Sequence, residues 1–99
     1  MPNDIGKIQI STGESYLGYT DNGRVSGFGV FSNPYTGEYL GEWFEETQNG
    51  YGIENFTDGD KFEGKFIEGK KIIGIYSWND GSYYEGEFEN NNFNGFVSF

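Results

Sequence analysis

Apolar and polar residues alternate along short stretches of this sequence, most clearly in Tyr84-Glu85-Gly86-Glu87-Phe88. The rings and the glycine fall on one side of an extended chain and the glutamates on the other, which is the pattern of a β-strand with one apolar face. A turn signal follows such a stretch, as at Asp21-Asn22-Gly23 and Glu68-Gly69, and a second strand follows the turn, as at residues 27–31. The pattern therefore predicts β-hairpins.

The hairpin pattern recurs at intervals of about 23 residues. Each unit begins with an aromatic-x-Gly triplet, at Tyr16, Tyr39, Phe62 and Tyr84, and an Asp-Gly or similar turn signal precedes the next unit. We divide the chain, as one domain, into residues 1–15 (the second half of a unit), 16–38, 39–61, 62–83 and 84–99 (an incomplete unit).

Repeated hairpins predict an all-β fold, a single-layer antiparallel meander of about nine strands and roughly 40 Å in length. The composition agrees, because Ala is absent and Leu occurs only at Leu17 and Leu40, so the best helix formers are scarce. The repeated glycines leave room for a ring of a neighbouring strand to lie against the backbone: Gly18, Gly29, Gly41, Gly52, Gly64, Gly74 and Gly86. We expect one face to carry Tyr16, Tyr39, Trp43, Phe56, Phe62, Phe66, Tyr76, Trp78, Tyr84 and Phe88.

The order of motifs within a unit resembles the membrane occupation and recognition nexus (MORN) repeat: aromatic-Glu-Gly-Glu-aromatic, a turn, Gly-x-Gly, an aromatic residue and Asp-Gly. The second unit keeps this spacing with Gly41, Trp43, Gly50-Tyr51-Gly52 and Asp58-Gly59. Departures from the pattern are Glu54 in place of an aromatic residue, Ile72 at the first glycine of Gly-x-Gly in the third unit, and Val97 at the second such glycine in the fourth. The resemblance implies a rod-like, non-catalytic stack of hairpins that organises other proteins.

Charge and composition exclude several classes of function. The 99 residues carry a formal charge of −10, which opposes binding to nucleic acid or to an anionic membrane, and the absence of Cys and His removes common nucleophiles, bases and metal ligands. We therefore expect no enzyme activity, no cofactor and no metal. With no visible secretory signal, we expect a cytoplasmic location, and the resemblance implies a cytoskeletal, ciliary or axonemal assembly.

The aromatic face has two interpretations. Its rings either form the core of the sheet or line a groove for a helix or an extended peptide, with Tyr16, Tyr39, Trp43, Phe62, Phe66, Tyr76, Trp78, Tyr84 and Phe88 as the partner-binding residues. The open terminal strands are a second contact site, where edge pairing allows a homodimer, and Phe93, Phe96 and Phe99 lie at the C-terminal edge.

Four of the six basic residues, Lys61, Lys65, Lys70 and Lys71, stand close together in the sequence. They form either a small patch for anionic lipid or an acidic partner, or an ordinary solvated strand face, and the second interpretation is favoured because the rest of the chain is acidic.

Acidic residues also offer weak candidates for chemistry. The pairs Glu85–Glu87 and Glu45–Glu46 have the spacing of the solvent-facing side of the repeat rather than of a catalytic pair, and residues 58–63 do not have the ligand spacing of a calcium loop. The sequence thus predicts a non-enzymatic scaffold that binds other proteins. The alternatives are a peripheral module for anionic phospholipid and a regulatory segment of a longer enzyme.

Overall fold

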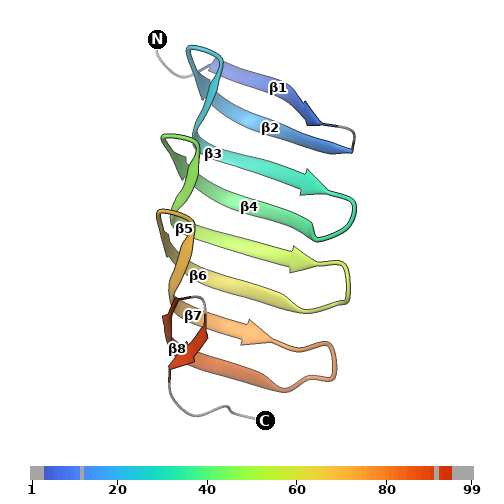
Figure 1. Ribbon diagram of the computed structural model, residues 1–99, viewed down its shortest axis with the longest axis vertical. Helices are drawn as coiled ribbons and strands as arrows, with labels where there is room; N and C mark the ends of the chain where they lie inside the picture. Colours follow the sequence, from blue (N-terminus) through green and yellow to red (C-terminus); the bar gives the residue numbers. More distant parts are fainter. Residues whose placement is uncertain (1–3, 12, 91, 95–99) are drawn as a thin grey trace.

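The computed structural model describes residues 4–11, 13–90 and 92–94 of the chain. Within these residues nine strands form one antiparallel sheet in which each strand pairs with the next along the chain (Figure 1). The strands are β1 (Asp4–Ser11), β2 (Glu14–Asp21), β3 (Arg24–Asn33), β4 (Gly37–Phe44), β5 (Thr47–Phe56), β6 (Lys61–Ile67), β7 (Lys70–Ser77), β8 (Tyr83–Glu89) and β9 (Asn92–Asn94). The predicted single-layer meander is confirmed. No helix that could cross a membrane occurs in the described part of the chain.

The strands are bent rather than straight. A straight strand of ten residues would be about 33 Å long, whereas the molecule measures 44 × 23 × 17 Å. Figure 1 shows the β2–β3, β4–β5 and β6–β7 hairpins curling forward on one side of the rod, with the turns between repeats on the other side. The sheet therefore folds partly around one of its own faces, and its long axis is close to the roughly 40 Å expected from the strand number.

A row of glycines marks the line of the bend. The register places Gly6, Gly18, Gly29, Gly41, Gly52, Gly64, Gly74 and Gly86 opposite one another from β1 to β8. We call this line the glycine row. A Cβ atom built at Gly29 or Gly52 would overlap the ring of Tyr16 or Tyr39, respectively. At these two glycines the ring belongs to the neighbouring strand, as expected, whereas the ring that comes close to Gly41, that of Tyr39, belongs to the same strand.

Three of these rings form a hydrogen bond with the backbone of their own strand, which bends around the ring. The hydroxyl groups of Tyr16, Tyr39 and Tyr84 each donate to the backbone carbonyl three residues later, at 2.7, 2.9 and 2.6 Å. In a straight strand that carbonyl would lie about 10 Å farther along the chain. The hydroxyl bond therefore requires the bend, whereas the bend does not require the bond, because the β6–β7 hairpin curls in the same way with Phe62 at the tyrosine position (Figure 1).

Each complete hairpin also contains a bulge close to the glycine row. In the first two repeats the bulge includes Gly27 and Gly50, whose φ angles are +88° and +102°. The third repeat has Ile72 at this position, and its bulge is smaller. Lys65 lies opposite Ile73, and the next residue, Phe66, lies opposite Lys71, so Ile72 has no partner in β6. A β-branched residue does not readily adopt the positive φ of a glycine, so the departure from the repeat pattern changes the local register.

The core lies on the inner, aromatic face. Tyr39, Phe62, Phe66, Tyr84 and Phe88 form one buried cluster, and Phe31, Trp43, Phe56, Tyr76 and Trp78 pack against it. Tyr16 is also buried and meets Trp43 edge-to-face at 5.7 Å. Similar edge-to-face pairs, 5.1–5.4 Å between centroids, continue along the rod from Tyr39 to Phe88. The shared aromatic face predicted from the sequence is confirmed.

Candidate functional site

The structure decides between the two interpretations of the aromatic face for most of its rings. Tyr16, Tyr39, Phe62, Phe66, Tyr84 and Phe88 are buried, so they form the core of the sheet and offer no surface to a partner. Trp43, Tyr76 and Trp78 are half-buried at its margin. A partner-binding groove made of all nine rings is therefore not present in this structure. Phe96 and Phe99 lie outside the described residues, as does the side chain of Phe93.

The four clustered lysines do not share one face. Lys71 lies on the inner face, whereas Lys65 is on the outer face. Lys61 forms an exposed ion pair, with its Nζ 3.8 Å from Glu63 Oε1. Lys70 is exposed beside the β6–β7 turn. Because the bulge at Ile72 moves Lys71 to the inner face, the simple alternation assumed from the sequence does not hold for this segment.

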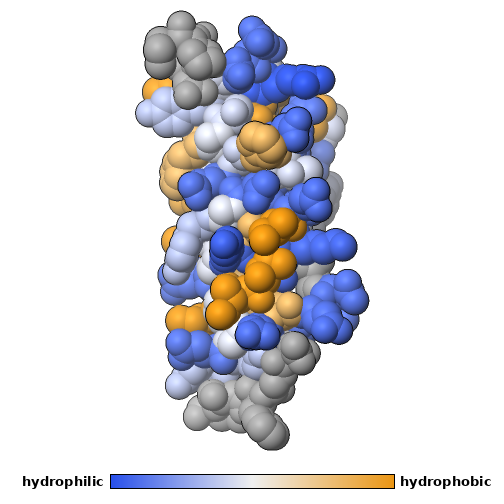
Figure 2. Space-filling model, turned by 90° about the vertical axis from the view of Figure 1, so that its left-hand side faces the viewer, coloured by the Kyte–Doolittle hydropathy of each residue, from blue (hydrophilic) through white to orange (hydrophobic). Residues whose placement is uncertain are grey.

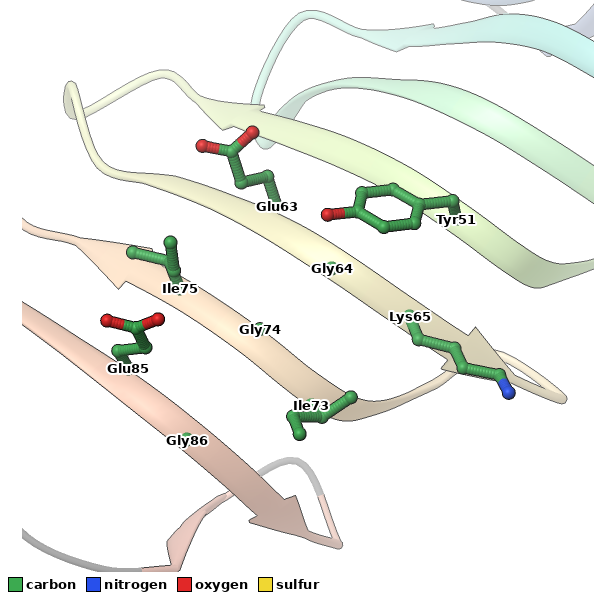
Figure 3. Close-up of a pocket in the computed structure, with 9 residues that line it drawn as sticks. All are labelled: Tyr51, Glu63, Gly64, Lys65, Ile73, Gly74, Ile75, Glu85 and Gly86. Atoms are coloured by element: carbon green, nitrogen blue, oxygen red, sulfur yellow. The ribbon is translucent and has the colours of Figure 1, made fainter.

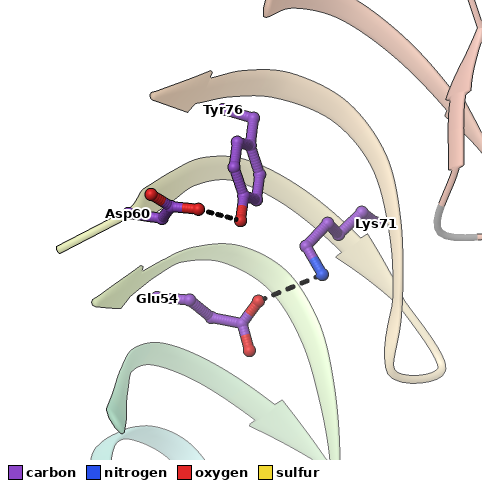
Figure 4. Close-up of polar contacts among 4 residues, drawn as sticks. All are labelled: Glu54, Asp60, Lys71 and Tyr76. Carbon is purple, nitrogen blue, oxygen red and sulfur yellow. Dashed lines mark hydrogen bonds and ion pairs between the residues drawn. The ribbon is translucent and has the colours of Figure 1, made fainter. Parts of the chain in front are cut away.

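Lys71 explains why Glu54 can replace an aromatic residue of the repeat. Its Nζ lies 3.3 Å from Glu54 Oε1, with 17% and 20% of the two side chains exposed (Figure 4). The same ammonium group lies 5.9 Å from the ring centroid of Phe56 and 5.5 Å from that of Phe62. This half-buried ion pair joins the second and third repeats and was not predicted from the sequence.

Asp60 makes a second polar link between repeats. Its Oδ2 accepts a hydrogen bond from the Tyr76 hydroxyl at 2.9 Å (Figure 4), and its Oδ1 accepts one from the Asn79 backbone N–H at 3.0 Å. Burial and the bond to Asp60 raise the pKa of Tyr76, and burial raises that of Tyr39. These groups stay neutral at physiological pH, so we assign them a structural role.

The outer face of the sheet carries the exposed apolar surface. Two rows of side chains flank the glycine row there, because residues next to a glycine in the strand point away from the aromatic core. One row runs from Leu17 through Val30, Leu40, Ile53 and Glu63 to Ile75 and Glu85. The other row includes Tyr19, Phe28, Glu42, Tyr51, Lys65, Ile73 and Glu87. We call the depression between them the outer groove.

The outer groove is hollow because its floor has no side chains. Over β5–β8 its floor is Gly64, Gly74 and Gly86 and its volume is about 530 Å³, with Tyr51, Ile73, Ile75, Glu63, Lys65 and Glu85 around it (Figure 3). A second hollow of about 460 Å³ continues along β3–β5. It shares Tyr51 with the first hollow and is also lined by Phe28, Leu40 and Ile53. On the side seen in Figure 2, apolar side chains gather along the middle of the rod with polar ones beside them.

The groove walls are exposed or half-buried apolar side chains bordered by charge. Tyr51 and Ile73 are 63% and 48% exposed, respectively. Glu42 is held in place at the border, because its Oε2 accepts a hydrogen bond from the Tyr51 backbone N–H at 2.9 Å. An apolar surface of this kind, with a charged rim, is a common feature of protein-binding sites. In the part of the chain that the structure describes, acidic side chains do not gather into a group that could hold a metal ion.

The outer groove was missed at the sequence level, although a signal for it exists. The positions between ring and glycine hold Glu63 and Glu85 in the later repeats but Leu17 and Leu40 in the earlier ones. The later repeats suggested a solvated face.

No protein-family model matches this chain, and no curated protein matches it.

Proposed function

We propose that this chain is a non-enzymatic, MORN-type scaffold module whose outer groove binds a partner protein. The observation that carries the proposal is the exposed apolar surface along the glycine row, walled by Leu40, Ile53, Tyr51 and Ile73. A sheet whose core rings are already packed gains nothing from exposing these side chains to water, so we attribute them to binding.

The rod shape supports the same function. Hydrogen bonds between turns of successive repeats, such as Asn79 Nδ2 to the Asp58 carbonyl at 2.7 Å and Thr57 Oγ1 to the Tyr35 carbonyl at 2.9 Å, hold neighbouring repeats in register. A partner would therefore meet a preformed surface and not have to order it, which lowers the entropic cost of binding. We further propose that the module serves a larger cytoplasmic assembly of the cytoskeletal or ciliary type, an assignment that rests on the resemblance.

A photo-crosslinking amino acid at position 51 tests the proposal. Tyr51 and Tyr35 are both exposed tyrosines, but only Tyr51 lines the groove, so position 35 is the matched control. In extract of the source cells we expect a protein adduct from position 51 that is lost when Ile73 is replaced by Asp, and none from position 35. Equal adducts from both positions, or adducts with lipid alone, would contradict the proposal.

A further inference from the structure

The outer groove runs along the rod and therefore crosses the strands. From β1 to β8, at about 4.8 Å per strand, the glycine row is about 34 Å long. Along this line the backbone N–H and C=O groups are paired with neighbouring strands in the sheet. An extended peptide laid across the strands would find no free backbone partners there, whereas a helix satisfies its own backbone groups internally.

The geometry points to an amphipathic α-helix of a partner protein, with basic residues at one end, as the occupant of the outer groove. This inference rests on the proposed function and specifies the kind of partner. A helix rises 5.4 Å per turn, against about 4.8 Å per strand. A helix tilted by roughly 27° from the glycine row would therefore place one turn over each strand. At that tilt a helix of about 25 residues would cover the whole row.

Charge sets the direction of the helix. Over β2–β5 the wall nearest the β3–β4 and β5–β6 turns is apolar, with Leu17, Val30, Leu40 and Ile53 in succession. Over β6–β8 the two walls carry Glu63, Glu85 and Glu87. Lys65 lies among them and Lys61 pairs with Glu63 at 3.8 Å, so the excess negative charge is at Glu85 and Glu87. An apolar stripe on the helix would lie over β2–β5, and its Lys or Arg residues would lie over β6–β8.

The same charges argue against a second copy of this chain as the occupant. The chain carries −10 overall. Two outer grooves placed face to face would bring together two acidic ends, each with three carboxylates and only Lys61 and Lys65 to balance them, or an acidic end and a largely apolar wall. Like charges in contact are costly. A basic partner gains from the same arrangement, and its association rate rises as the salt concentration falls.

Fluorescence anisotropy with a synthetic peptide tests this inference. The probe is a labelled 18-residue peptide with Leu at helical i, i+3, i+4 spacing and four Lys at one end. We expect the full chain to bind it, with a gain of helical signal in circular dichroism on binding. The double variant E85K/E87K should weaken binding about tenfold. E45K/E46K makes the same charge change at the β4–β5 turn, outside the groove, and should leave the affinity within about twofold.

Two further measurements separate the possible failures. A peptide of the same composition with a central Pro cannot form the helix. If it binds as tightly as the probe and Tyr51→Ser weakens both peptides, the helical occupant is wrong but a protein-binding groove remains. If Tyr51→Ser and Ile73→Asn leave probe binding unchanged, or if the chain binds only phosphatidylserine vesicles, both the helical occupant and the proposed function are overturned. Thermal melting of each variant checks that it is folded.

Discussion

Gly52 lies beneath the ring of Tyr39, and its replacement by alanine tests how the rings and glycines hold the sheet together. A Cβ atom at this position would overlap the ring, which is 2% exposed. The backbone of Gly52 has an ordinary strand conformation, so alanine would not be strained there and would even gain about 0.5–1 kcal/mol over glycine. The cost therefore comes from the ring alone.

The structure sets the size of that cost. Displacing Tyr39 would lose about 2–3 kcal/mol of apolar burial. It would also weaken two edge-to-face contacts, with Trp43 at 5.4 Å and Phe66 at 5.1 Å, worth about 0.5–1.5 kcal/mol each. The hydroxyl bond to the Glu42 carbonyl adds about 1 kcal/mol. After the gain from alanine, we expect Gly52→Ala to lower the free energy of unfolding by about 4 kcal/mol.

Urea denaturation followed by tryptophan fluorescence measures this change, because Trp43 packs on Tyr39. Gly81→Ala is the control: nothing lies within 4 Å of a Cβ there, and only the positive φ of +96° opposes alanine, at about 1 kcal/mol. If Gly52→Ala does not fold, Gly86→Ala is a second variant: its Cβ would lie 2.8 Å from the Tyr84 hydroxyl, and its φ of +157° adds a backbone strain for which Gly81→Ala is the comparison. A Gly52→Ala protein as stable as Gly81→Ala would refute the account.

Three further predictions concern stability. Glu46 has a φ of +66° in the β4–β5 turn, so Glu46→Gly should stabilise the fold by about 1 kcal/mol in urea, and a destabilised variant would contradict this. Lys71→Met should cost about 1–3 kcal/mol because Glu54 is left unpaired, whereas the double variant with Glu54→Met should recover most of the loss; equal losses would contradict it. Burial raises the pKa of Tyr39 and Tyr76, so the unfolded chain ionises first above about pH 10, and the melting temperature should fall there but not between pH 7 and 9. In Tyr39→Phe this alkaline loss should be smaller, and an unchanged loss would argue against the assignment.

The strands and their shared aromatic face could be predicted because each repeat places rings and glycines in phase. The triplets beginning at Tyr16, Tyr39, Phe62 and Tyr84 follow the two-residue period of a strand, and recurrence makes the assignment independent of any single position. The bend of the sheet could not be read in the same way. It depends on the packing of rings against the glycine row and on bulges, which are contacts in three dimensions rather than spacings.

The positions of individual charges were harder to predict because one extra residue reverses a strand's faces. The bulge at Ile72 brings Lys71 to the inner face, opposite Phe66, and there it meets Glu54 from the preceding repeat. The outer groove was missed for a related reason. Glu85 and Glu87 suggested a solvated face, although Leu17 and Leu40 occupy the corresponding side in earlier repeats.

Glycine amides give the most direct test of the outer groove, because the chain carries glycines of two kinds. Those of the glycine row, such as Gly52, Gly64 and Gly74, form the floor of the groove, whereas Gly23 and Gly69 lie in hairpin turns with open space around them. In a ¹⁵N–¹H correlation spectrum recorded during titration with the basic helical peptide, we expect the amides of the glycine row to shift together and the turn glycines to stay in place. Shifts confined to the turn glycines, or to the indole N–H groups of Trp43 and Trp78 on the inner face, would contradict the account.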